Sequence, residues 1–85
     1  MTLELFNDLD EMEQHEALWE HGVIIGDRVE GEHKIILYQV FSFYVELYYH
    51  IKNNALRKLT AFDELEKLDA YILLFDLKNL TNTGK

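Results

Sequence analysis

The stretch that decides the fold is IILYQVFSFYVELYYHI, residues 35–51. Eleven of its seventeen residues are β-branched or aromatic, and this composition favours strand over helix. A single strand of this length would span roughly 55 Å, which is too long for so small a domain. We therefore predict two strands joined by a turn near Phe41-Ser42.

Strand and turn signals continue on both sides of this stretch. An earlier strand begins at Val23, and Gly26 is a candidate bulge within it. Asn53-Asn54 favours a tight hairpin because Asn tolerates positive φ, so a further strand pairs back after it. The prediction is an antiparallel β-meander of three to four strands over about residues 23–60.

We expect a helix on each side of this sheet, at about residues 3–20 and at about residues 63–80. The first has an apolar stripe at helical spacing, formed by Leu5, Leu9, Met12 and Trp19. The second has a narrow stripe that should cover the sheet, formed by Leu65, Leu68, Ile72 and Phe75. Since 85 residues are too few for two independent cores, we predict one small α+β domain over residues 1–85.

The net charge of −8 is concentrated near the N-terminus. Residues 1–20 hold seven acids and no Lys or Arg, whereas residues 21–85 hold nine acids and eight bases. This distribution argues against a nucleic-acid partner, which would require clustered Lys and Arg. A small basic group, Lys52, Arg57 and Lys58, lies in the last hairpin. The acidic and basic regions could pair within the chain, pair between protomers, or each face water.

Several classes of protein are disfavoured by composition. The absence of cysteine excludes a disulfide framework, a thiol nucleophile and Cys-ligated zinc. The first residues lack the basic and apolar regions of a signal peptide, and residues 35–51 are too short and too interrupted for a membrane span. We therefore expect a cytoplasmic protein without a membrane partner or a cofactor.

The alternation of residues 43–52 defines two faces of the central strand. The odd positions should face the core, and the even positions form a row of Tyr44, Glu46, Tyr48 and His50, which Tyr38 could extend. One interpretation is a small-molecule site in which Glu46 or His50 transfers a proton. The other is an exposed face with ordinary cross-strand tyrosine pairs. Neighbours in the row are about 7 Å apart, beyond hydrogen-bond reach, which argues against catalysis.

A second candidate is an acidic ridge on the first helix, formed by Glu4, Asp8, Glu11 and His15. It could bind a divalent cation only if another element completed the ligand shell. The sequence contains no HExxH, Ca²⁺ loop, phosphate loop or GxSxG motif. A solvated ridge is the favoured interpretation, so we predict no metal site, no catalytic residue and no enzymatic activity.

The C-terminal helix has a second apolar stripe, formed by Leu73, Leu77 and Leu80. One sheet can cover only one helix face, so this stripe requires either the N-terminal stripe or a second copy in a homodimer. The acidic first helix could in addition bind a basic protein surface. The leading expectation is a non-catalytic protein–protein interaction module that self-associates. The alternative is a small-molecule-binding domain that uses the even face of the central strand.

Overall fold

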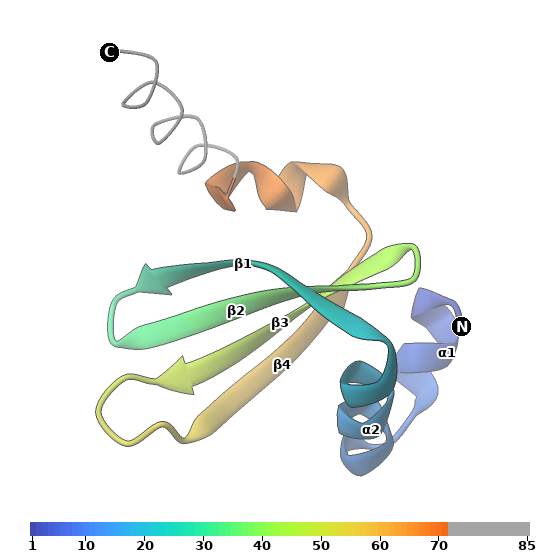
Figure 1. Cartoon of the computed structure of the whole chain (residues 1–85), viewed down its shortest axis with the longest axis horizontal. Coiled ribbons are helices and arrows are strands. Elements are labelled where there is room, and N and C mark those ends of the chain that lie inside the picture. The colour runs from blue at the N-terminus through green and yellow to red at the C-terminus, as the bar shows by residue number, and fades with distance from the viewer. Residues whose placement is uncertain (72–85) are drawn as a thin grey trace.

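The computed structural model describes residues 1–71. Its elements are α1 (Leu3–Asp8), α2 (Glu11–His21), β1 (Gly22–Glu30), β2 (His33–Val40), β3 (Phe43–His50), β4 (Leu56–Phe62) and the 3-10 helix η1 (Leu65–Leu68). The strands form one antiparallel sheet in the order β1-β2-β3-β4. Helices α1 and α2 lie near the β2–β3 hairpin, and the chain after β4 passes to the other side of the sheet (Figure 1). The predicted α+β meander is confirmed.

The turns and the bulge lie at the predicted residues. Phe41-Ser42 connects β2 to β3, with Phe41 at a φ of 53°, and Asn54 has a φ of 56° in the β3–β4 turn. The register between β1 and β2 shifts between Ile24 and Gly26. This bulge reverses the alternation of side chains along β1, because one extra residue faces a single partner position. From Gly26 onward, each side chain therefore lies on the opposite face of the sheet from the one predicted by simple alternation counted from Ile24.

The predicted N-terminal helix is interrupted at Leu9-Asp10. Helix α1 ends at Asp8, and Asp10 is the N-cap of α2. The Asp10 carboxylate accepts a hydrogen bond from the Glu13 N–H at 2.8 Å, and the Glu13 carboxylate accepts one from the Asp10 N–H at 3.1 Å. This reciprocal capping box starts α2 at Glu11, so α1 does not continue into α2 as one helix.

The predicted N-terminal apolar stripe is wrong at three of its four positions. Leu5, Met12 and Trp19 are exposed, and the helical residues that are buried are Phe6, Ala17 and Leu18. A helical period holds only within one helix. The interruption at Asp10 therefore resets the phase, and a pattern read through it assigns the wrong face of α2 to the core.

The main core lies between these helices and the sheet. Its buried members are Phe6, Ala17, Leu18, Val40, Phe43, Val45 and Leu47. The Phe6 and Phe43 rings are tilted against each other, with centroids 5.3 Å apart. The odd residues of β3 face this core, as predicted. Tyr38 pairs with Val45 and packs on the same core, so the prediction that Tyr38 extends the even row is wrong.

The opposite face of the sheet is also partly covered. Ile35, Leu37 and Phe62 are buried there, and η1 leads into a helical turn that ends the described chain at Tyr71. The predicted helix over 63–80 thus starts as a 3-10 helix. Leu65 is 68% exposed, so the prediction that it covers the sheet is wrong. Residues 72–80, including the stripe of Leu73, Leu77 and Leu80, lie outside the described residues. Within residues 1–71, no helix has the length and apolar character that crossing a membrane requires.

Candidate functional site

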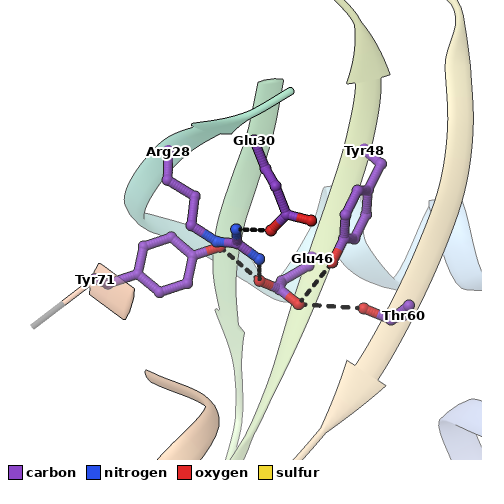
Figure 2. Close-up of polar contacts among 6 residues, drawn as sticks. All are labelled: Arg28, Glu30, Glu46, Tyr48, Thr60 and Tyr71. Carbon is purple, nitrogen blue, oxygen red and sulfur yellow. Dashed lines mark hydrogen bonds and ion pairs between the residues drawn. The ribbon is translucent and has the colours of Figure 1, made fainter. Parts of the chain in front are cut away.

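A cluster of polar side chains surrounds Glu46 in the middle of β3 (Figure 2). Glu46 is only 7% exposed, although carboxylates are rarely buried unless they are paired. The register places Glu46 between Leu37 of β2 and Thr60 of β4, on the face away from α1 and α2. Burial at this position requires that other groups replace the water around the carboxylate.

Four side chains from different parts of the chain make this replacement. Glu46 Oε2 accepts hydrogen bonds from the Tyr71 hydroxyl at 2.6 Å and from Arg28 Nη2 at 3.3 Å. Glu46 Oε1 accepts hydrogen bonds from the Thr60 hydroxyl at 3.4 Å and from the Tyr48 hydroxyl at 3.5 Å. Each carboxylate oxygen therefore receives two donors. A carboxylate accepts only through these oxygens, so Glu46 itself has little remaining capacity to bind a ligand. Within residues 1–71, Arg28 Nε is the one buried side-chain polar atom without a hydrogen-bond partner.

Arg28 supplies the positive charge of the cluster. It also pairs with the exposed Glu30, and its guanidinium lies 5.4 Å from the centre of the Tyr71 ring. Burial lowers the pKa of Arg28, but hydrogen bonds to Glu30, Tyr71 and Glu46 outweigh this effect and leave the pKa raised. The same pairing lowers the pKa of Glu30. Both partners are therefore charged at neutral pH.

The two phenols of the cluster act as hydrogen-bond donors. Burial raises the pKa of Tyr71, and its hydrogen bond to Glu46 raises it further. Burial, followed by the charge of Glu46, raises the pKa of Tyr48. Both phenols therefore keep their protons at neutral pH and donate them in hydrogen bonds to Glu46. The cluster joins Tyr71 to side chains of three strands.

The structure brings together only two members of the predicted even row. Glu46 and Tyr48 share the cluster, whereas the Tyr44 ring lies beside Phe62, with centroids 5.6 Å apart. Sequence reasoning missed Arg28, Thr60 and Tyr71. The bulge before Gly26 was a usable signal for Arg28, because the reversed alternation places Arg28 on the face of Glu46.

His50 lies away from the cluster and connects two turns. Its Nδ1 accepts a hydrogen bond from the Lys52 N–H at 3.3 Å, and its Nε2 lies 3.3 Å from the Glu32 carboxylate. A backbone bond of 2.9 Å from the Ile51 N–H to the Glu32 carbonyl joins the same turns. Both ring nitrogens of His50 therefore have partners within the protein.

The predicted acidic ridge is divided between two helices. Glu4 and Asp8 belong to α1, and Glu11 and His15 belong to α2, beyond the break at Asp10. The prediction that the four residues share one continuous helix is therefore wrong. Across residues 1–71, no three His, Asp or Glu side chains are grouped so that they could hold a metal ion.

The outer surface of α2 exposes two large apolar side chains. Trp19 is 84% exposed and Met12 is 73% exposed, and their spacing of seven residues places them on one side of the helix. An open hollow of about 300 Å³ lies between them, lined by Met12, His15, Glu16, Trp19 and Glu20. We call these five residues the α2 face. Exposed apolar side chains that are grouped on one surface, rather than scattered singly, make that surface a candidate site for a partner.

The charge of the α2 face is not balanced by cations of the described chain. Residues 1–20 contain no Lys or Arg. Within residues 1–71, the only ion pair that involves α1 or α2 is Glu20 with the adjacent His21, at 3.6 Å. The α2 face therefore combines exposed apolar side chains with negative charge that is free to attract a cationic surface.

A scan against protein-family models finds no match for this chain, and searches of curated proteins and of solved structures find none either. The two candidate sites are therefore compared by geometry. The Glu46 cluster is occupied by its own side chains, and the α2 face is open.

Proposed function

We propose that this chain is a non-catalytic protein-interaction module and that its α2 face binds a basic protein surface. The observation that supports this most directly is the 84% exposure of Trp19. Trp is among the residues that contribute most to binding when a partner buries them. Met12 lies two helical turns away on the same side, so the pair has the spacing by which an amphipathic helix enters an apolar groove.

The surrounding acids favour a basic partner over a neutral one. Glu16 and Glu20 flank Trp19, and neither pairs with a Lys or Arg within residues 1–71. Exposed ion pairs contribute only about 0–1 kcal/mol each. The apolar contact should therefore provide most of the affinity, while the charges speed the encounter and orient the partner.

The Glu46 face supports a structural role better than ligand binding. Its two carboxylate oxygens are satisfied by Arg28, Tyr48, Thr60 and Tyr71. A ligand would have to displace these donors and replace every hydrogen bond that they make, because an unsatisfied buried charge is costly.

The test is capture of partners by the wild-type chain and by Trp19→Ala, with bound proteins identified by mass spectrometry. The expected result is one basic protein whose affinity falls at least tenfold with Trp19→Ala, a loss of about 1.4 kcal/mol. Binding is then remeasured with both purified proteins at two salt concentrations. Leu65→Ala, at another exposed apolar residue, is the matched control and should bind as wild type does. Equal binding by wild type and Trp19→Ala would contradict the proposal.

A further inference from the structure

We propose that the basic surface recognised by the α2 face is the β3–β4 hairpin of a second copy of this chain, so that copies associate head to tail. The inference rests on the function proposed for the α2 face and identifies its partner. The hairpin surface consists of Ile51, Lys52, Arg57 and Lys58, which we call the basic hairpin end.

The basic hairpin end combines one exposed apolar side chain with three exposed cations. Ile51 is 50% exposed, and the three cations are also exposed. Within residues 1–71, neither Lys52 nor Arg57 forms an ion pair, and Lys58 Nζ lies 4.6 Å from the centre of the Tyr48 ring. This arrangement mirrors the α2 face, in which exposed apolar side chains are flanked by acids.

The acids nearest the basic hairpin end are already engaged. Glu32, in the β1–β2 turn, faces His50, and Glu30 pairs with Arg28. No acidic residue lies between Leu47 and Phe62 in the sequence. Within residues 1–71, Lys52 and Arg57 therefore have no carboxylate partner, which makes their charges complementary to the α2 face of another copy.

The two complementary surfaces cannot meet within one copy. Helices α1 and α2 lie at one end of the strands, and the β3–β4 turn lies at the other (Figure 1). Strand β3 runs between these ends over eight residues, or about 26 Å at ~3.3 Å per residue. No ion pair joins the two surfaces within the described chain. Contact between them therefore requires a second copy.

Charge also selects head-to-tail contact over symmetric pairing of two α2 faces. Symmetric pairing would bring together two regions that each have seven acids and no Lys or Arg. Like charges facing each other across an interface are costly. Contact between the α2 face and the basic hairpin end brings opposite charges together and buries Met12 and Trp19 against Ile51. In such an assembly, one terminal copy has a free α2 face and the other has a free basic hairpin end. The assembly can therefore add further copies or close into a ring.

Two variants of the full chain test this geometry by sedimentation equilibrium. Trp19→Ala with Glu16→Lys inactivates the α2 face, and Lys52→Glu with Arg57→Glu inactivates the basic hairpin end. Wild type is expected to show an average mass that increases with concentration and decreases with added salt. Each variant alone should be monomeric. An equimolar mixture should form a heterodimer and nothing larger, since each variant retains only one of the two surfaces.

A control variant separates the surface from net charge. Lys34→Glu with Lys67→Glu changes the charge by the same amount, at exposed lysines outside the basic hairpin end, and should associate as wild type does. Circular dichroism should show that all variants are folded.

Three results would overturn the inference: a monomeric wild type at millimolar concentration, self-association of the hairpin variant, or no heterodimer in the mixture. The broader proposal would survive any of these if Trp19→Ala still abolished capture of another basic protein. It would fail independently if Trp19→Ala bound every partner as wild type does.

Discussion

At Glu46, a charge that would be costly to bury alone is stabilised by donors from three strands and from Tyr71. The shortest of these contacts, 2.6 Å, is made by the Tyr71 hydroxyl. Gly26 permits this approach, because a Cβ there would lie 3.3 Å from the Tyr71 ring. One glycine, one carboxylate and one phenol thus attach the chain after β4 to the sheet.

The pKa of Tyr71 gives this attachment a predicted pH dependence. Because the folded pKa is raised, the unfolded chain releases the phenol proton first as pH rises above about 10, the ordinary tyrosine value. The contribution of Tyr71 is therefore complete below pH 10 and declines above it. Tyr71→Phe should cost about 1–2 kcal/mol at pH 7, and this difference from wild type should shrink between pH 10 and 11.

Urea unfolding of wild type and Tyr71→Phe at pH 7, 9, 10 and 11 measures this difference. Tyr44→Phe is the control, since the Tyr44 hydroxyl makes no hydrogen bond within residues 1–71. A difference for Tyr71→Phe that stays constant across the pH range would show that the phenol does not hold its proton as the geometry indicates.

At the scale of elements, features set by neighbouring residues could be predicted from sequence. The two faces of β3 follow from strand alternation, and the turns at Phe41 and Asn54 follow from strand length and residue type. Tyr71 could not be assigned to the cluster in this way. It contacts Glu46 across 25 residues of sequence, and no local pattern encodes that contact.

The α2 face was missed for a different physical reason. A single helix through residues 3–20 turns Met12 and Trp19 toward the core, whereas the capping box at Asp10 and Glu13 starts a second helix that turns them outward. The Asp-x-x-Glu signal for this break was present in the sequence, and it determines whether Trp19 is a core residue or a surface residue.

The β2–β3 turn provides a test of backbone conformation within an element. Phe41 has a φ of 53°, which is unfavourable for a bulky residue, and its ring lies 4.8 Å from the ring of His21. Substitution by Ala or by Gly removes this ring contact equally, but only Gly adopts the positive φ readily. Phe41→Gly should therefore be more stable than Phe41→Ala by about 1 kcal/mol.

The same pair of substitutions at Ser42, whose φ is not positive, is the matched control for urea unfolding. There Ala should be at least as stable as Gly, because Gly loses more backbone entropy on folding. An Ala preference at both positions would contradict the left-handed conformation of Phe41.

At the scale of the whole molecule, helices α1 and α2 have two roles that lie on opposite surfaces. Their inner residues, such as Phe6 and Leu18, are almost fully buried against the sheet. Their outer residues, such as Trp19, are in water and lie among acids that have no Lys or Arg partner within residues 1–71. Deleting both helices would therefore remove a folding surface and a binding surface together, and it could not show which role the charge serves. Single substitutions on the two surfaces separate these roles.

Phe6→Ala should reduce the stability of the fold, whereas Trp19→Ala should reduce association. The Phe6 side chain is 0% exposed, so its loss should cost about 3–5 kcal/mol. A chain of this size has a total stability of roughly 4–13 kcal/mol, so Phe6→Ala should remove a large fraction of it. Trp19→Ala should change stability by no more than about 0.5 kcal/mol while it weakens association. Urea unfolding followed by circular dichroism measures both changes. A comparable loss of stability in the two variants would show that Trp19 packs against the protein's own core, and the α2 face would then not be free for a partner.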